Sequence, residues 1–390
     1  MNKGFYQIIS IAKREVKRIL SRGLYTFCMV LAPVMAFLFF TTLMGEGLPA
    51  ELPAGVVDED NTATTREVIR NLDAFQQTNI IEHYPDFMSA RKAMQQGKIY
   101  SFYYIPAGTT QLAISGKQPV VSFYTAASYL IPGSLAYRDM KMMSEYASGG
   151  VGRATLYARG YTEDQAMAVL QPIKMEMHAV NNPSLNYSVY LSNTILPGIL
   201  MLLIMQVVIY SIYVEMKEET AQQWLAMADN DIVKALIGKL LPQIVTWTLM
   251  GLLCLFMLYG VWRFPLNNGI WPMLLDMFLL INASLALGVF FCGLVPSLRW
   301  ALSLATLWGV LSFPISGFSF PHWAFPATLK GLAWLFPLRH YFLIYVDQAL
   351  NGLPLHYSWL NIAIMLAFWA LPIMLLGRLR KFLLEYHYTH

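Results

Sequence analysis

Six long apolar runs limit most strongly how this chain can fold. Each contains about 20 residues or more with few charges, which is the length that an α-helix needs to cross a bilayer. Backbone polar groups in hydrocarbon must be satisfied within the segment, so we expect these runs to be helices. They cover residues 24–44, 195–214, 240–262, 270–296, 300–320 and 359–377. The sequence therefore predicts an α-helical membrane protein with six transmembrane helices.

The composition agrees with a bilayer environment. Hydrophobic residues make up 56% of the chain and charged residues 13%, which is far from the balance of a soluble domain. The three cysteines all lie within apolar runs, where cysteine behaves as a small apolar side chain, and they are Cys28, Cys254 and Cys292. We therefore expect no disulfide framework, and the small net charge of +4 gives no reason to expect a nucleic-acid partner.

The positions of Lys and Arg predict the orientation of the chain, because basic residues concentrate in short cytoplasmic connections. One side of the membrane would hold most of them: Lys3, Lys13, Arg14, Lys17, Arg18, Arg22, Lys217, Lys234, Lys239, Arg299, Arg378, Arg380 and Lys381. The short segments of the other side hold only Arg263, Lys330 and Arg339. Both termini, including the tail at 378–390, are therefore expected in the cytoplasm, with the spans in the plasma (inner) membrane.

The N-terminal segment, residues 1–23, has an amphipathic pattern. Apolar residues recur at helical spacing, and most of the basic residues fall on the other face. The apolar positions are Phe5, Ile8, Ile9, Ala12, Val16, Ile19 and Leu20. The pattern indicates a helix that lies along the inner leaflet, and a solvated basic leader is the alternative. The apolar run that follows is too long for a secretory signal, so we expect an uncleaved first span.

Residues 45–190 separate the first run from the second and have the composition of a soluble domain. Short apolar stretches bounded by turn residues predict four strands, at 55–57, 79–84, 99–105 and 120–124. Asp86 is placed to cap a helix, and Thr162 and Gln165 have capping-box spacing before a helix expected over 166–180. The pattern predicts a mixed α/β domain on the extracytoplasmic side, inserted between the first and second transmembrane helices.

The segment 321–345 is apolar but interrupted by several Pro and Gly residues. It is a poor spanning helix, and we expect a pair of short helices that re-enter the membrane from the outer face. A seventh span is the alternative, which would place the C-terminal basic residues outside. His322 and His340, with Asp347, lack the spacing of a metal motif, so no metal site is expected.

The cytoplasmic stretch after the second run, residues 215–226, contains the candidate partner-binding residues. Charges and amides beside an aromatic residue predict a short amphipathic helix, with Trp224 as a knob that docks in a groove of a soluble protein. The candidates are Lys217, Glu218, Glu219, Thr220, Gln222, Gln223, Trp224 and Leu225. A solvated helix end between two spans is the alternative.

Three polar residues within the apolar runs are candidates to line a transport pathway: Gln206, Asp276 and Asn282. An ionisable residue at membrane depth suggests a functional role. For Asp276, however, we favour a structural ion pair with Arg263 or Arg339 near the outer surface. For Gln206, an interhelical hydrogen bond and a lining position are both open.

Two short stretches and the order of the predicted segments carry a family resemblance. Val56-Val57-Asp58-Glu59-Asp60-Asn61 opens the inserted domain, and Glu218 to Leu225 is followed by Gly238-Lys239-Leu240. With the basic leader, the inserted domain and the four further spans, they resemble the permease subunits of type-2 ABC exporters over essentially the whole chain. The family loop usually has Gly immediately before its Thr and an acidic residue two positions after it, where this chain has Glu219 and Gln222.

The resemblance implies that residues 215–226 form a coupling helix seated against an ATPase subunit. It also implies that the leader is a connecting helix, with Lys13, Arg14, Lys17 and Arg18 beside that contact. The chain has no Walker A sequence, so ATP and Mg would be bound by a separate subunit. The chain itself is expected to be a transport subunit and not an enzyme, with no cofactor of its own.

Further partners and the cargo are also implied by the resemblance. A second permease chain is expected, as a homodimer or heterodimer, because six spans enclose a pathway poorly alone; a periplasmic adaptor is a further candidate. The cargo would be a drug-like molecule, a lipid, a glycan or a peptide. Two alternative functions are an ion-coupled secondary transporter and a non-transport envelope scaffold or ligand-sensing protein.

Overall fold

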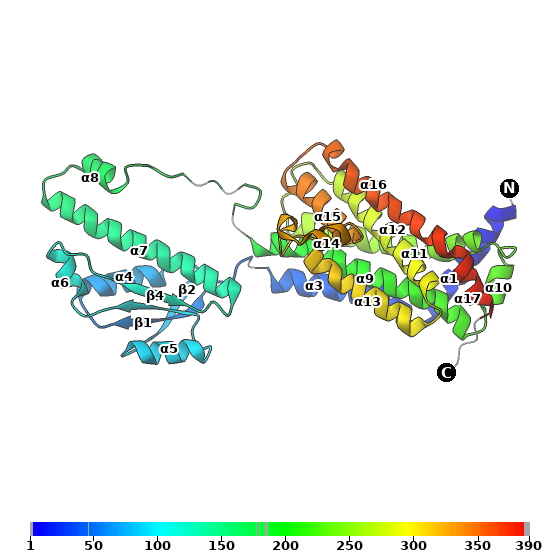
Figure 1. Cartoon of the computed structure of the whole chain (residues 1–390), viewed down its shortest axis with the longest axis horizontal. Coiled ribbons are helices and arrows are strands. Elements are labelled where there is room, and N and C mark those ends of the chain that lie inside the picture. The colour runs from blue at the N-terminus through cyan, green and yellow to red at the C-terminus, as the bar shows by residue number, and fades with distance from the viewer. Residues whose placement is uncertain (1–2, 46, 177, 179, 184–185, 386–390) are drawn as a thin grey trace. The chain divides into compact units, whose positions relative to one another are not determined.

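The computed structural model describes residues 3–45, 47–176, 178, 180–183 and 186–385. These form two compact units, which we describe separately. One is a helical bundle made from Met1–Gly47 and Ala179–His390, and the other is an α/β unit, Leu48–His178 (Figure 1). The last residues of the predicted tail, 386–390, lie outside the described residues.

Six helical segments of the bundle are long and apolar enough to cross a membrane, so the prediction of six transmembrane helices is confirmed. They are Gly23–Leu43, Tyr187–Lys217, Ile232–Val261, Trp271–Leu294, Leu298–Ile315 and Leu355–Glu385. The second is longer than predicted because Asn186 caps it, accepting hydrogen bonds from the backbone N–H groups of Ser188 and Val189.

Several spans contain short changes of helix type, so the elements are numerous. In chain order they are α1 (Lys3–Ser21), α2 (Gly23–Thr26), η1 (Phe27–Leu31), α3 (Ala32–Leu43), α9 (Tyr187–Lys217), α10 (Ala221–Ala226), α11 (Ile232–Leu255), η2 (Phe256–Val261), α12 (Trp271–Leu294), α13 (Leu298–Ile315), η3 (His322–Ala324), α14 (Ala327–Ala333), α15 (Pro337–Tyr345), η4 (Val346–Leu350), η5 (Leu355–Ser358), α16 (Trp359–Ala367), η6 (Phe368–Leu375) and α17 (Leu376–Glu385).

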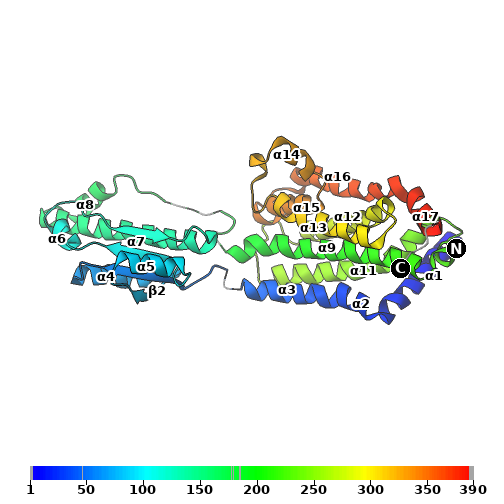
Figure 2. The ribbon, with the colours of Figure 1, turned by 60° about the horizontal axis from the view of Figure 1, so that its bottom comes forward.

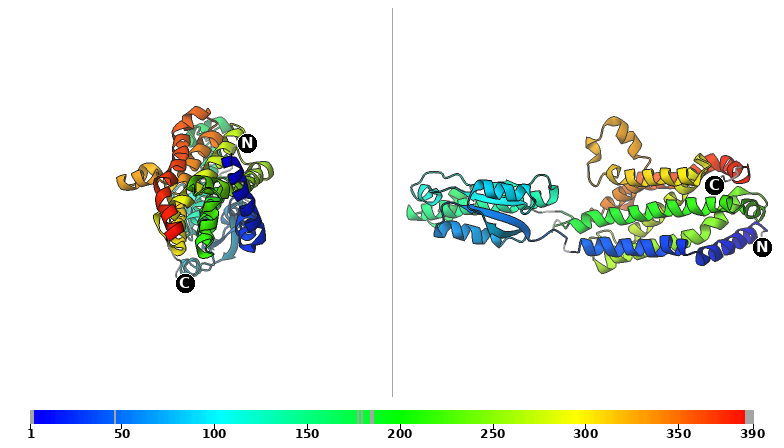
Figure 3. Two further views of the ribbon diagram at one scale, coloured as in Figure 1. Left: turned by 90° about the vertical axis from the view of Figure 1, so that its right-hand side faces the viewer. Right: turned by 90° about the horizontal axis from the view of Figure 1, so that it is seen from below.

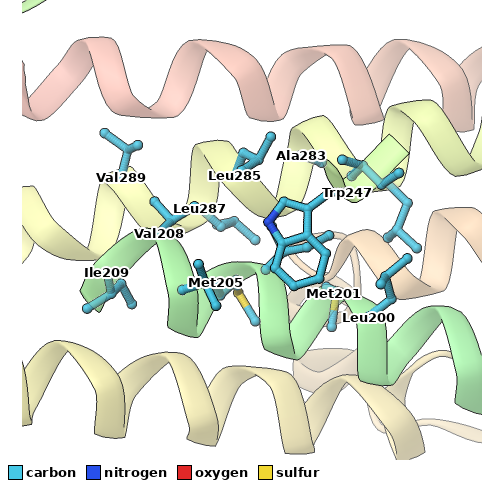
Figure 4. Packing of buried hydrophobic residues seen from close by; sticks show 14 of the residues in the cluster. Leu200, Met201, Met205, Val208, Ile209, Trp247, Ala283, Leu285, Leu287 and Val289 are labelled. Atoms are coloured by element: carbon cyan, nitrogen blue, oxygen red, sulfur yellow. The ribbon is translucent and has the colours of Figure 1, made fainter. Parts of the chain in front are cut away.

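The centre of the bundle is the contact between α9 and α12. Figure 4 shows Met205 and Val208 of α9 near Leu285 and Leu287 of α12, with Trp247 of α11 also in this core. The two helices approach closely at Gly288, where a Cβ atom would lie 3.0 Å from Val208. Small residues at such crossings are how membrane helices gain packing contacts without a hydrophobic driving force.

The bundle has two ends that carry different features. We call the end at which α3 ends and α9 begins the insertion end, because the α/β unit is inserted there. We call the other the termini end, since α1 and α17 both lie there (Figure 1, Figure 2). Between α13 and α16 the chain forms the short helices α14 and α15 at the insertion end, as a pair of short helices was predicted. The helix α15 is largely buried, whereas α14 stands out from the bundle (Figure 3).

The α/β unit contains the predicted mixed fold. Its four-stranded sheet has the order β2-β1-β3-β4, with β1 parallel to β2 and β3 and with β4 antiparallel to β3. The elements are β1 (Leu52–Asp58), α4 (Ala63–Asp73), β2 (Thr78–His83), α5 (Phe87–Gln95), β3 (Ser101–Ile105), α6 (Thr109–Ile114), β4 (Ser122–Thr125), α7 (Leu130–Ala158) and α8 (Glu163–Leu170).

Alternating side chains of the strands divide the core of this unit into two layers. Val56 packs with α4 and α7 on one face of the sheet, and Val57 packs with α5 on the other. The caps Asp86 and Thr162 were predicted correctly. The helix predicted over 166–180 is wrong in its end, because α8 stops at Leu170. Pro172 disfavours helical backbone at the residue before it, Gln171, which has φ −130°.

Candidate functional site

A cluster of charged side chains lies buried at the termini end, where α1, the last turn of α9 and the start of α11 meet. It consists of Arg14, Glu15, Arg18, Glu215 and Lys239, and we call it the paired cluster. Burial of a charge is costly unless an opposite charge and hydrogen bonds compensate it. The geometry of the cluster therefore decides what holds these three helices together.

Lys239 is the centre of the paired cluster. Its Nζ atom lies 2.8 Å from Glu15 Oε2 and 2.8 Å from Glu215 Oε1, and it donates a hydrogen bond to each. The side chains of Lys239 and Glu215 are 0% exposed and that of Glu15 is 1% exposed. One ammonium group on α11 thus binds α1 and α9 at the same time.

Two arginines of α1 complete the cluster around Glu215. Arg14 donates two parallel hydrogen bonds of 2.8 Å to the two carboxylate oxygens, which is the strong bidentate form of this pair. Arg18 also pairs with Glu215 and donates a hydrogen bond of 2.9 Å to Glu218. Burial opposes the charge of Arg14, but the hydrogen bond and the charge of Glu215 outweigh it and raise the pKa of Arg14.

The loop that follows α9 is folded back onto the same cluster. Glu219 has a left-handed backbone, with φ +56°, and this turn ends α9 before α10 begins. Thr220 then donates a hydrogen bond of 2.5 Å from Oγ1 to Glu215 Oε2. The loop between α9 and α10 is therefore held by the paired cluster and not only by its own backbone.

The prediction that Trp224 is an exposed knob is wrong. Its side chain is 0% exposed, its Nε1 donates to the Ala235 carbonyl at 3.3 Å, and the Lys239 ammonium lies 4.9 Å from the ring centroid. The reason is the spacing of Ala221, Trp224 and Leu225, which places all three on one face of α10 against the chain's own helices. The exposed candidates of this stretch are Lys217, Glu218, Glu219, Gln222 and Gln223.

The helix α1 is docked on α11 and is not a solvated leader. Ile11 is buried, and it lies so close to Gly238 that a Cβ atom at that position would be 2.8 Å from the Ile11 Cβ. The four predicted basic positions divide into two groups. Arg14 and Arg18 point into the paired cluster, whereas Lys13 and Lys17 are exposed. Exposed apolar side chains remain on this helix at Phe5, Val16 and Leu20.

Sequence reasoning did not single out Glu15, Glu215 and Lys239 as site residues. The signals were present. Glu15 is the one acid in the basic segment 1–23, Glu215 directly follows the apolar run 195–214, and Lys239 directly precedes the run 240–262. Each is ordinary on its own, and only the packing of α1 onto α9 and α11 shows that they meet.

The three candidate pathway residues differ in their surroundings, and Gln206 makes the interhelical hydrogen bond that was one of its two open alternatives. Gln206 donates hydrogen bonds to Thr306 Oγ1, at 2.7 Å, and to the Leu302 carbonyl, so it links α9 to α13. Asn282 donates to the Phe278 carbonyl of its own helix. The predicted ion pair of Asp276 is wrong: the side chain is 0% exposed, and neither carboxylate oxygen has a hydrogen-bond partner within the described part of the chain. Neither Arg263 nor Arg339 forms a hydrogen bond with Asp276 among the described residues.

Comparison with known proteins decides the family. A sequence model of the ABC-2 family transporter protein matches residues 24–378, which is most of the chain. The chain belongs to the ABC-2 family. No curated protein matches it. Members of this family are multi-pass membrane proteins, typically permeases without an ATPase domain, and they generally pair with ATPase subunits.

The ABC-2 assignment bears on two features of the site. Glu219 occupies the position at which the resembled family usually has Gly, and its left-handed φ is the conformation that Gly adopts most readily. Glu219 thus has a backbone conformation that Gly would adopt without strain. Across the described ranges, no three His, Cys, Asp or Glu side chains are grouped as metal ligands would be.

Proposed function

We propose that this ABC-2 chain is the permease subunit of an ATP-driven exporter in the plasma (inner) membrane. Both termini would lie in the cytoplasm and the α/β unit outside. ATP and Mg would be bound by a separate ATPase subunit, and a second permease chain, identical or similar, would complete the pathway. The cargo would be a drug-like molecule, a lipid, a glycan or a peptide, and a periplasmic adaptor would be a further partner.

One observation carries this proposal: Lys239 pairs with Glu15 and Glu215 in a fully buried position. ATP-driven movement of a soluble subunit reaches membrane helices only through a stiff contact. The paired cluster would supply that stiffness, because displacement of the loop at 218–220 would pull on Thr220 and hence on Glu215. The same carboxylate binds α1 and α11, so the three helices would move together.

We propose that the ATPase contacts the exposed side chains of this stretch, in particular Lys217, Glu219, Gln222 and Gln223. The buried Trp224 and Leu225 would act as the floor beneath them, which keeps α10 fixed to the bundle. In this arrangement residues 215–226 form the coupling helix and its preceding turn. The helix α1 would be the connecting helix, with its exposed apolar side chains at the inner leaflet and Lys13 and Lys17 near the lipid head groups.

The test is to co-purify the chain with an ATPase subunit that carries a Walker A sequence. We expect the double variant Gln222→Arg with Gln223→Arg to lose association and to lower chain-dependent ATP turnover by about tenfold, as for a loss of about 1.4 kcal/mol of interface free energy. Both side chains are exposed, so folding should be preserved. Arg299→Gln, an exposed change at the start of α13, is the control. Unchanged association and turnover in the double variant would refute the contact.

Orientation has its own test. Lys117 of the α/β unit and Gln222 are both exposed, so a cysteine at either position is accessible to a reagent on its own side. We expect an impermeant maleimide to label Lys117→Cys but not Gln222→Cys on intact cells, with the parent chain as background control. Labelling of Gln222→Cys alone would invert the proposed topology.

A further inference from the structure

An unpaired cation lies buried at the insertion end of the bundle. Arg339, in α15, is 5% exposed, and its Nε and Nη1 atoms have no hydrogen-bond partner among the residues that the structure describes. A guanidinium group stays charged in proteins, so it cannot relieve this burial by losing a proton. Its nitrogens can only donate hydrogen bonds. Nε and Nη1 therefore lack an acceptor among the described residues.

The sequence supplies no acid near Arg339 in the chain. From Met277 to Val346, a stretch that includes α13, α14 and α15, there is not one Asp or Glu. The Nη1 atom lies instead against the backbone of Gly317, where a Cβ atom would be 3.6 Å from it. Among the described residues no acidic side chain pairs with Arg339, whereas the paired cluster shows that the same bundle balances charges elsewhere.

Other unsatisfied polar groups lie in the same region. Trp308 Nε1, also a donor, is buried and has no partner in the described residues, and the same holds for His322 Nε2. Burial lowers the pKa of His322, and the positive charge of Arg339 lowers it further. The Trp308 ring stacks on Phe336 with centroids 4.6 Å apart, and both lie with Phe325 in one apolar cluster. A further donor without a partner, Trp308 Nε1, therefore lies within this aromatic wall.

The position is that of a membrane–water interface. The apolar cluster of Trp308, Phe325 and Phe336 lies near the end of α13. The segment that follows exposes Phe320 and Trp323, and Trp323 is 79% exposed. Aromatic side chains of this kind concentrate at the level of lipid head groups. A ligand that brings both a negative group and an apolar chain would meet Arg339 and the aromatic wall at the same depth.

We propose that Arg339, with the aromatic wall of Trp308, Phe325 and Phe336, binds the phosphate group of an anionic amphiphile at the insertion end of the bundle. The phosphate oxygens accept from the guanidinium, which suits their geometry in a bidentate contact. The acyl chain lies along the apolar side chains of α13 and α14. The inference goes beyond the proposed transport function, because binding requires neither ATP nor an ATPase subunit.

The test uses the full chain in lipid nanodiscs, with phosphatidylcholine alone or with phosphatidylglycerol added. We expect phosphatidylglycerol to raise the midpoint of thermal unfolding of the parent chain and of Arg263→Gln, an exposed arginine at the same end. We expect Arg339→Gln to lose this rise and Arg339→Lys, which keeps the charge but not the bidentate contact, to show a smaller one. Inorganic phosphate added to phosphatidylcholine discs should give no rise.

Three results would overturn the proposal. One is an equal rise in Arg339→Gln and the parent chain. Another is no rise in the parent chain, as expected if a second copy supplies an acid to Arg339. The third is the same rise with inorganic phosphate alone, which would indicate a soluble anion.

If Arg339→Gln does not fold, the comparison of Arg339→Lys with the parent chain decides, and an undiminished rise there counts against the site. The measurement contains no ATP, so failure of the transport proposal leaves it unaffected.

Discussion

The two ends of the helical bundle treat buried charge in opposite ways. At the termini end, the side chains of Glu215 and Lys239 are fully buried, and Lys239 Nζ lies 2.8 Å from Glu215 Oε1. At the insertion end, Asp276 and Arg339 are buried to a similar degree, and Nε and Nη1 of Arg339 and both Asp276 oxygens have no partner in the described chain. A buried ion pair holds helices together, whereas burial of an ionisable side chain without a partner is unfavourable. The termini end thus holds its buried ionisable side chains in ion pairs, whereas the insertion end holds two that lack a partner among the described residues.

The largest expected effect comes from breaking the paired cluster at its centre. We expect Lys239→Met to lower the free energy of unfolding by about 3–5 kcal/mol, because Glu15 and Glu215 would lose their shared cation in a buried site. Chemical unfolding in detergent micelles would measure it. Lys234→Met, on the same helix, removes only a partly exposed ion pair with Asp231, of 3.2 Å between Nζ and Oδ2, and should change the value by no more than about 1 kcal/mol. Similar values for the two variants would contradict the central role of Lys239.

The sharpest form of the comparison replaces one acid at each end by its amide. We expect Glu215→Gln to cost about 2 kcal/mol, since it weakens charge-assisted hydrogen bonds from three basic side chains. Asp276→Asn should leave the free energy of unfolding nearly unchanged, because neither side-chain oxygen of Asp276 has a hydrogen-bond partner in the described chain, so the substitution breaks no such contact. Both variants would be measured under the same unfolding conditions. A loss for Asp276→Asn as large as that for Glu215→Gln would show that Asp276 is paired after all.

Glycines extend the comparison to packing. A Cβ atom at Gly238, at the termini end, would lie 2.8 Å from Ile11, so Gly238→Ala should push α1 away from α11 and cost about 1–3 kcal/mol. Gly331 in α14 has nothing within 4 Å of such an atom. Gly331→Ala should therefore stabilise by up to about 1 kcal/mol through helix propensity. Hydrogen exchange of α1 would report the first change directly, and unaltered protection there would argue against tight docking of that helix.

The smallest effect concerns a buried acid with partial compensation, Asp139 of the α/β unit. Burial raises its pKa, although the Thr78 hydroxyl, at 3.1 Å, and the charge of Arg138 oppose that shift. Because the folded pKa is the higher one, its stabilising contribution is present at low pH and is lost as the pH rises above about 4. We expect Asp139→Asn to flatten this dependence by under about 1 kcal/mol. Hydrogen exchange of α7 and β2 from pH 4 to 7 would measure this dependence. An unchanged pH profile in the variant would show that Asp139 does not cause it.

Much of the architecture could be predicted because it depends on local pattern. The apolar runs indicated six spans, and short apolar stretches bounded by turn residues indicated strands at 79–84 and 99–105. Asp86 and Thr162 marked helix starts through their own side chains. These features arise between residues a few positions apart. The end of α8 was missed for a local reason as well, since the effect of Pro172 on its neighbour was not weighed against the apolar pattern.

The candidate site was predicted only in part. The stretch 215–226 was found from its polarity, but Trp224 was placed on the wrong side. Amphipathic spacing identifies an apolar face without saying whether that face meets a partner or the chain itself. Asp276 was given a partner by proximity to the expected membrane surface, which does not determine the direction of a side chain.

What the sequence determined by itself is the number of spans, the place of the inserted α/β unit and the absence of a Walker A sequence from these residues. What only the tertiary structure decided is which charges meet. Glu15, Glu215 and Lys239 lie on three helices and far apart in the chain, so no local spacing relates them. The same holds for the lone charge of Arg339, because a missing partner becomes visible only when every neighbour in space is known. Pairing of buried charge is a property of helix packing, and packing is set by contacts between distant segments.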